Sequence, residues 1–490
     1  MKENAAHDRS ALQRIARKAM YERGLEPEFS KEALAQVADI DAPVLDASGD
    51  VRDLRKLLWC SIDNDDSRDL DQLSVMEELA GGDVKLRVAV ADVDALVRKG
   101  TPVDLHAAHN TTSVYTAAQI FPMLPEKLST DLSSLNPGVD RAAMVVEYVV
   151  HPDGTLGDTA IHRAIVHNHA KLAYNAVAAW LDGKGPMPEA LAAVPGLEKQ
   201  IRVQEQTAVR LKTLRHKKGA LDFQSLESRP VFQGEKVVAL QALSSNRATS
   251  LIEELMIAAN GVSARFLDAK RSPILRRVVR SPDRWTKIAR VAEEHGTTLP
   301  AQADSRALEK FLVASKLADP VRFPDLSLVI VKLMGSGEYI AESAGDDSPG
   351  HFGLAVRDYS HTTAPNRRFP DLLTHRLLKA AIDGKPAPYS MGELAGLAAR
   401  CTEMESAATK VERQVRKSAA ALLLKDRIGE VFEGVITGAA DKGTFVRVFD
   451  PPVEGRVMRG ESGLKVGDKL RVSLVATDFE RGFLDFARAR

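Results

Sequence analysis

Residues 62–72 read IDNDDSRDLDQ and carry five aspartates within nine positions: Asp63, Asp65, Asp66, Asp69 and Asp71. The segment directly follows a β-like apolar run, residues 57–62. Carboxylates this close together repel one another, so a folded protein keeps them either on a solvated loop or around a divalent cation whose charge offsets the repulsion. The residues alone leave both interpretations open.

The chemistry of the segment limits which metal it could bind. Hard oxygen ligands select Mg²⁺ or Mn²⁺ over zinc. A calcium-binding EF-hand loop is excluded, because Arg68 stands at the sixth position, where glycine is needed, and Ser74 at the twelfth, where glutamate is needed. Cys60 and Cys401 are too far apart in the sequence for a disulfide framework or a zinc-ligand spacing. Any metal must therefore be held by oxygen.

Around this segment the chain predicts a large α+β domain, residues 51–426. Residues 85–93 and 142–150 are β-like runs, whereas residues 250–270 and 372–382 have helical apolar spacing. Beyond residue 427 the pattern changes to five short strands punctuated by glycine, which predicts a small closed β-barrel over residues 427–490. Residues 1–50 predict two short amphipathic helices, near residues 10–23 and 30–38, followed by a linker.

The composition is that of an ordinary globular protein. The chain has 490 residues, 44% hydrophobic and 27% charged, enough for about two to four domains. No apolar run is long enough for a membrane span, and no secretion signal is apparent, so we expect a cytoplasmic protein. The net charge is zero, with 67 basic and 67 acidic residues. Basic residues nevertheless concentrate in residues 210–218 and 270–290, which suits either a groove for a polyanion or a solvated helix face.

Several ordered blocks resemble the ribonuclease II (RNB) family. The acidic segment resembles the family signature through Asp63, Asp69 and Asp71. Further blocks are similar to the family over residues 92–141, 217–223, 252–260 and 351–376, the last containing Arg367 and Arg368. The C-terminal strands resemble the S1 domain, an OB-fold RNA-binding module. Ordered matches over most of residues 55–425 are far more specific than a single motif.

The resemblance implies a hydrolytic 3′-to-5′ exoribonuclease that releases 5′-nucleoside monophosphates from single-stranded RNA 3′ ends. One or two Mg²⁺ ions, with Mn²⁺ as the substitute, would bind at Asp63, Asp69, Asp71 and Gln72. Asp69, Asp71 and Arg367 would be catalytic. The two aspartates would act through the metal, and the guanidinium fork of Arg367 suits phosphate oxygens. The resemblance further assigns RNA contacts to these residues: Tyr115, Phe223, Arg367, Arg368, Glu254 and Glu412. Tyr115 would stack on a terminal base, and a monomer is expected.

The sequence departs from the family pattern in three places. Gln72 replaces the fourth acid, which removes one negative charge, and Ala364 replaces a serine. Residues 1–50 are too few for the two cold-shock domains that typically precede the catalytic domain, so we expect a small helical module of helix-turn-helix or winged type.

On the barrel, Phe445 and Phe449 are either RNA-stacking or core aromatics. A catalytically silent RNA-binding protein is the alternative function, with chemistry lost at Gln72.

Overall fold

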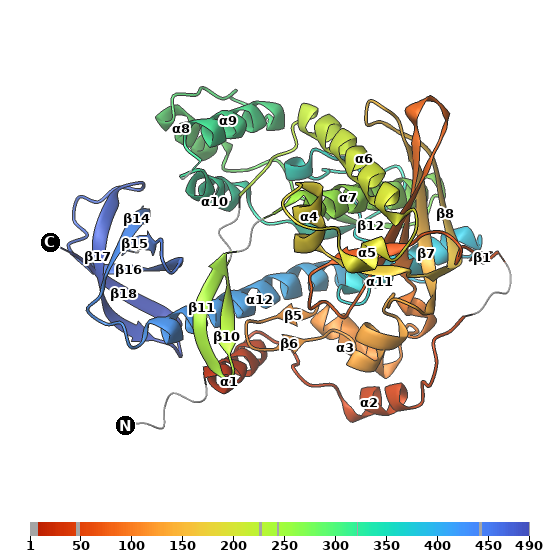
Figure 1. The fold of residues 1–490 in the computed structure, drawn as a ribbon, viewed down its shortest axis with the longest axis horizontal. Helices are drawn as coiled ribbons and strands as arrows, with labels where there is room; N and C mark the ends of the chain where they lie inside the picture. The colour runs from red at the N-terminus through yellow and green to blue at the C-terminus, as the bar shows by residue number, and fades with distance from the viewer. Residues whose placement is uncertain are drawn as a thin grey trace.

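The acidic segment joins two strands of a seven-stranded sheet in the computed structural model, whose strands β7 and β8 lie on the right in Figure 1. The structure describes residues 8–45, 50–224, 228–242, 245–320, 322–440 and 443–489. The strand order is β1-β8-β7-β4-β3-β2-β9. These strands are β1 (Arg52–Asp53), β2 (Cys60–Asp63), β3 (Gln72–Glu78), β4 (Val84–Ala91), β7 (Asp140–Val150), β8 (Leu156–His167) and β9 (Ala170–Ala173).

The inner strands are antiparallel, and the two edge strands, β1 and β9, pair in parallel with β8 and β2. The predicted strands at residues 85–93 and 142–150 are confirmed as β4 and β7. Both are buried along most of their length, which explains why they read as nearly continuous apolar runs. The acidic loop, residues 64–71, connects β2 to β3 beside the edge strand β9.

Two long helices cover the sheet, α6 (Leu197–Lys217) and α7 (Arg247–Ala269). An Asn246–Thr249 capping box starts α7, and the Tyr148 hydroxyl of β7 donates a 3.0 Å hydrogen bond to the Leu255 carbonyl of α7. The predicted helices at residues 250–270 and 372–382 are confirmed as α7 and α11 (Phe369–Ile382). Packing on the sheet thus fixes α7, whose other contacts position the functional loops.

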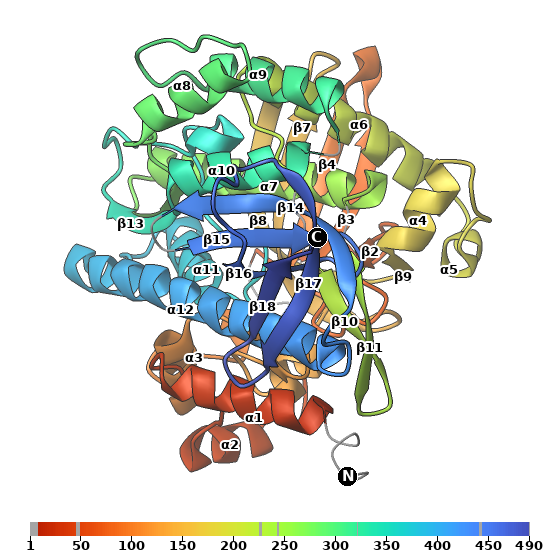
Figure 2. The ribbon, with the colours of Figure 1, turned by 90° about the vertical axis from the view of Figure 1, so that its left-hand side faces the viewer.

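Helix α12 (Met391–Leu424) is 34 residues long and runs from the catalytic domain to the C-terminal barrel (Figures 1 and 2). It begins with a capping box between Ser390 and Glu393. Its successive segments contribute to three hydrophobic clusters: one with the central sheet, one with the N-terminal helix and one with the barrel. The helix therefore connects all the major parts of the chain.

The N-terminal helices α1 (Asp8–Tyr21) and α2 (Lys31–Ala38) match the predicted helices but do not form the compact helix-turn-helix or winged module that we expected. Helix α1 packs on α12, whereas α2 packs on α3 (Pro102–Asn110). Leu12 and Ala33 accordingly belong to different hydrophobic clusters. Each helix is an integral part of the catalytic domain surface, because its partner helix belongs to that domain.

The C-terminal strands form the predicted closed barrel, in the order β14-β15-β16-β18-β17 and with the character of an OB-fold. Its strands are β14 (Val431–Ala440), β15 (Gly443–Val448), β16 (Val453–Arg459), β17 (Lys469–Asp478) and β18 (Phe483–Arg488). Gly455 permits the closure, because a Cβ there would lie 2.4 Å from the Leu484 carbonyl oxygen.

The remaining elements surround this framework. They are β5 (Val114–Tyr115), β6 (Ile120–Phe121), α4 (Tyr174–Leu181), α5 (Glu189–Ala192), β10 (Ser228–Gln233), β11 (Lys236–Ala242), β12 (Ile274–Val278), α8 (Trp285–Glu294), α9 (Ser305–Ala318), α10 (Phe323–Met334) and β13 (Glu338–Glu342). Within the described ranges, every helix is too short or too polar to cross a membrane.

The packing of α1 on α12 predicts a large stability difference between two leucine-to-alanine variants. Leu12 is 0% exposed in the cluster shared with α12, whereas Leu34 of α2 is 51% exposed. We expect Leu12→Ala to lower the free energy of unfolding by about 2 to 4 kcal/mol, because it leaves a cavity. Leu34→Ala should change it by less than about 0.5 kcal/mol. Urea titration of both variants measures the difference, and equal effects would contradict an integrated α1.

Candidate active site

Backbone hydrogen bonds on both sides hold the last residues of the acidic loop. The Leu70 N–H donates to the Ser134 hydroxyl at 2.9 Å, and the Leu70 carbonyl accepts from the Leu135 N–H at 2.9 Å. The Asp71 carbonyl accepts from the Ala91 N–H of β4, also at 2.9 Å. The Leu70 side chain is buried in the core, at 1% exposure. Because neighbouring side chains in an extended segment point to opposite sides, the buried Leu70 directs both Asp69 and Asp71 away from that core.

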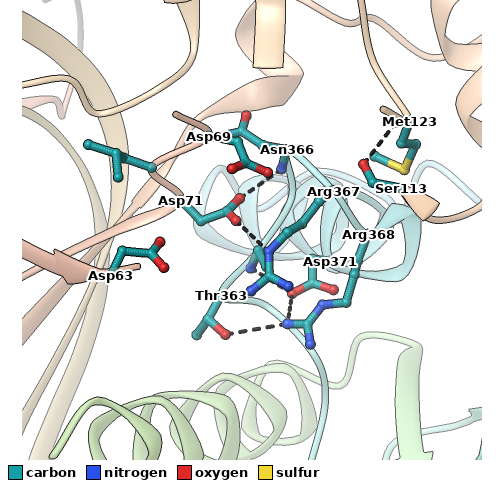
Figure 3. Close-up of polar contacts among 12 residues, drawn as sticks. Asp63, Asp69, Asp71, Ser113, Met123, Thr363, Asn366, Arg367, Arg368 and Asp371 are labelled. Carbon is teal, nitrogen blue, oxygen red and sulfur yellow. Dashed lines mark hydrogen bonds and ion pairs between the residues drawn. The ribbon is translucent and has the colours of Figure 1, made fainter. Parts of the chain in front are cut away.

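Asp71 is the central residue of the site and is 3% exposed (Figure 3). Its Oδ2 accepts a 2.9 Å hydrogen bond from Arg367 Nε, and its Oδ1 accepts from the Asn366 backbone N–H at 3.0 Å. Burial raises the pKa of Asp71 to about 7, despite the opposing effect of the Arg367 guanidinium, and the charge of Asp69 contributes in the same direction. The negative charge at Asp71 is therefore incompletely compensated by the protein.

The other two signature aspartates lie close enough to influence one another electrostatically. Asp63 is the last residue of β2, and Asp69 lies in the loop before β3; both are partly buried. Burial raises the pKa of Asp63, and the charge of Asp69 adds to this rise. Asp65 and Asp66 are exposed on the same loop. Burial thus separates the three signature aspartates from the solvated ones, a distinction that the sequence left open.

The loop that carries Arg367 is fixed by side chains of α7 and α11. Asn260 Oδ1 accepts from both the N–H and the hydroxyl of Thr362, each at 2.9 Å. Asp371 Oδ1 accepts from the Ala364 N–H at 2.8 Å and from Arg368 Nη2 at 2.7 Å. Arg368 is therefore paired with Asp371 through its Nη2, and its RNA contact stays a prediction. Arg367, by contrast, has a side chain 40% exposed, and its Nη groups have no partner in the described part of the chain.

Tyr115 is positioned by the same loop. The Ser113 N–H donates to the Arg367 carbonyl and the Phe369 N–H to the Thr111 carbonyl, which pairs the two segments in antiparallel fashion. The Tyr115 hydroxyl donates a 2.7 Å hydrogen bond to Asp69 Oδ2. Burial and the neighbouring Asp69 carboxylate raise the pKa of the Tyr115 phenol, so it remains a donor. Tyr115 is 37% exposed beside the aspartates, as a stacking platform requires.

Glu412 reaches the same place from α12. Its Oε1 accepts a 2.8 Å hydrogen bond from the Tyr115 backbone N–H. The structure therefore brings Glu412 to the site as the sequence predicted, where it supports the Tyr115 backbone.

Phe223 and Glu254 lie elsewhere. Phe223 lines a separate cavity of about 730 Å³ between α10, α12 and the barrel, together with Phe445 and Arg447. Phe445 is partly exposed and Phe449 is exposed, so neither is a core aromatic.

The assignment of Glu254 as an RNA contact is wrong for this conformation. Glu254 is 2% exposed and accepts two hydrogen bonds from Arg215 of α6, at 3.0 and 2.5 Å. The neighbouring Glu253 is the exposed one. Sequence reasoning also missed Asn366 and Asp371, which position Asp71 and Arg368; both stand inside the block at residues 351–376 that carried the resemblance.

The donor set fits a hard cation in chemistry but is not assembled around one. Within the described residues, no three histidine, cysteine, aspartate or glutamate side chains stand in positions that would already hold a metal ion. Both Asp71 oxygens instead accept hydrogen bonds from protein donors. Gln72, at the start of β3, is partly buried, and no hydrogen bond joins its side chain to the described residues.

Comparison with known proteins agrees with this geometry. The RNB domain matches residues 51–384, and the RNase II-type exonuclease C-terminal S1 domain matches residues 430–489. Ribonuclease R of Escherichia coli (strain K12) is 32% identical over 470 residues, covering 89% of this chain and 57% of that protein. Ribonuclease R of Vibrio cholerae is 31% identical, covering 94% of this chain and 59% of that protein. The chain thus spans less than two thirds of the length of these relatives.

Among solved structures, Mycoplasma genitalium RNase R in complex with ribose-methylated single-stranded RNA has a TM-score of 0.86 at 22% identity. The match covers 98% of this chain and 78% of that one. The same protein has been solved with double-stranded RNA. These likenesses show a shared fold. Because the family match covers more than half of the residues and includes the site around Asp71, the chain belongs to the RNB family and carries an RNase II-type C-terminal S1 domain.

Proposed function

We propose that this chain is a divalent-metal-dependent exoribonuclease that hydrolyses single-stranded RNA from its 3′ end and releases 5′-nucleoside monophosphates. The observation that carries the proposal is the buried Asp71, paired with a partly exposed Arg367 beside Asp63, Asp69 and the exposed ring of Tyr115. Membership of the RNB family and the name of its relatives, Ribonuclease R, support it. RNA decay or 3′-end processing is the corresponding role.

The reaction requires a water oxygen to form a bond to phosphorus while the bond from phosphorus to the 3′ oxygen of the preceding nucleotide breaks. That oxygen leaves with a proton, so the products are a mononucleotide and a chain shortened at its 3′ end. Arg367 is suited to the scissile phosphate, because its Nε is held by Asp71 while its Nη groups remain available as donors. Fixing the Nε aims the rest of the guanidinium without any movement of the loop.

Asp63, Asp69 and Asp71 would hold one or two Mg²⁺ ions, and the Gln72 amide oxygen is a neutral candidate ligand. A bound divalent cation supplies charge neutralisation at the phosphate and a more acidic water. Tyr115 would stack on the terminal base, which accepts all four bases because every base has an aromatic face. The Glu412 contact fixes the backbone of this platform.

The alternative is a catalytically silent RNA-binding protein. Two observations favour it: glutamine at position 72, and the hydrogen bonds that already occupy both oxygens of Asp71. It predicts RNA binding without cleavage, so the experiments below separate the two functions.

Asp71→Asn should abolish cleavage while leaving the fold intact, because the amide is nearly isosteric but cannot supply the buried charge. We expect the rate of mononucleotide release from 5′-labelled single-stranded RNA to fall on the order of 100-fold or more. The matched control is Asp66→Asn, a change of the same kind at an exposed position of the same loop. Similar rates in both variants would contradict the role of Asp71, and no cleavage by the unmodified protein would favour the silent alternative.

Removal of divalent metal should stop the reaction reversibly. With EDTA, the ladder of 3′-shortened products should disappear, and excess Mg²⁺ or Mn²⁺ should restore it, since carboxylate oxygens select these ions. Gel analysis of the labelled RNA measures this. Undiminished shortening in EDTA would show that the carboxylates act without a metal.

Tyr115 should contribute by stacking rather than through its hydroxyl. Tyr115→Ala is expected to weaken binding of a single-stranded oligonucleotide by about 1 to 3 kcal/mol. Tyr115→Phe removes the hydrogen bond to Asp69 but retains the ring, so it should bind almost as tightly as the unmodified protein. Fluorescence anisotropy in EDTA measures both. Equal losses in the two variants would indicate that the hydroxyl, rather than the ring, is the important group.

A further inference from the structure

A second cavity lies where the C-terminal half of α12 faces the N-terminal helix α1. It has a volume of about 570 Å³ and lies between α1, α12 and the turn from β17 to β18, which Figure 2 shows next to one another. We call it the α1–α12 groove. Its lining includes six basic residues, Lys18, Arg23, Lys410, Arg413, Lys417 and Arg481, but only two acids, Glu22 and Glu480. It therefore has a local positive excess in a chain whose net charge is zero.

The two acids of the groove are already engaged. Glu480 accepts a bidentate contact from Arg14, and this pair ties the β17–β18 turn to α1. Glu22 lies 3.8 Å from the Lys18 ammonium and 3.9 Å from the Arg23 guanidinium. Neither acid is thus left to neutralise the cations of α12.

Three cations of the groove lie on α12. Lys410, Arg413 and Lys417 are exposed on one face of α12, at helical spacings of three and four residues. Within the described part of the chain, none of the three forms an ion pair with an acidic side chain, and none donates a side-chain hydrogen bond. Like charges at this spacing destabilise a helix modestly, and a ligand that supplies negative charge would offset this cost.

An aromatic side chain completes the groove. Phe483, the first residue of β18, is 55% exposed and lines the same cavity. A row of phosphate-binding cations beside an exposed aromatic ring is the usual combination for single-stranded nucleic acid, because the cations follow the backbone and the ring stacks on a base. An acidic protein segment would satisfy the cations but would not require the ring.

We propose that the α1–α12 groove binds single-stranded RNA outside the active site, holding part of the chain whose 3′ end is being processed. The proposal rests on the proposed function for the identity of the ligand. Arg413 and Lys417 also line the larger cavity that contains Phe223 and Phe445, so the two cavities share one wall on α12. RNA in the groove would add to the contacts of the S1 domain without occupying the site at Asp71.

The test uses a variant confined to this groove: Lys18→Ala, Lys410→Ala and Phe483→Ala. All three residues are exposed, and none lines the larger cavity. The control is Lys31→Ala with Lys56→Ala, two exposed lysines outside both cavities. Affinity for long poly(U) is measured in EDTA over a range of salt concentrations, and hydrolysis of a tetranucleotide is measured with Mg²⁺.

The groove variant should bind poly(U) at least roughly tenfold more weakly. Its slope of log affinity against log salt should fall by about 1.4, the value for two lost phosphate contacts on a single strand. Tetranucleotide hydrolysis and the control variant should be unchanged.

Unchanged poly(U) affinity and slope in the groove variant would overturn the proposal, as would an equal loss in the control. Loss of binding to polyglutamate, with poly(U) binding retained, would also overturn it in favour of an acidic protein partner. Because poly(U) binding is measured without turnover, it stands even if the unmodified protein fails to hydrolyse the tetranucleotide. Absence of cleavage would contradict the proposed function. The poly(U) measurements alone would then show whether the α1–α12 groove binds RNA.

Discussion

The pairing of Asp71 with the Arg367 loop is the contact on which the candidate site depends. It joins residues 296 positions apart, one just before β3 and the other just before α11. A buried carboxylate needs compensation, and the Arg367 guanidinium and the Asn366 N–H provide part of it. The remaining imbalance is seen in the raised pKa of Asp71. The contact thus stabilises a carboxyl group that burial would otherwise leave uncompensated.

The supporting residues keep this arrangement rigid. Asn260 and Asp371 hold the loop from α7 and α11, and the antiparallel pairing of residues 111–113 with residues 367–369 adds backbone hydrogen bonds. Tyr115 and Arg367 are thus positioned by main-chain contacts as well as by their own side chains. Such preorganisation is valuable for phosphoryl transfer, in which the protein contributes mainly positioning and electrostatics.

Much of this could be predicted from the sequence, because the relevant signals are local. Apolar runs identified β4 and β7, helical spacing identified α7 and α11, and regular short strands identified the barrel. Ordered motif blocks also brought Asp71, Arg367, Tyr115 and Glu412 to one place. The paired arginines, however, proved to have different environments, since Arg367 binds Asp71 through its Nε whereas Arg368 binds Asp371 through its Nη2.

The failures have physical reasons. Glu254 lies three positions after Leu251 and four before Ala258 on the buried face of α7, so helical periodicity did contain the warning that it is internal. The separation of α1 from α2 had no such signal, because it depends on partner helices distant in the sequence. Metal binding at Gln72 and the RNA contact of Phe223 stay predictions.

Helix α12 has a consequence for how the chain folds. A domain boundary drawn near residue 427 separates the barrel in sequence, yet α12 supplies Ala421 and Leu424 to the barrel core and Val411 and Val415 to the cluster with α1. The barrel, the N-terminal segment and the catalytic domain therefore all pack against this one helix. Loss of any one of these would expose apolar surface on the others, so the units named from sequence are parts of one cooperative folding system.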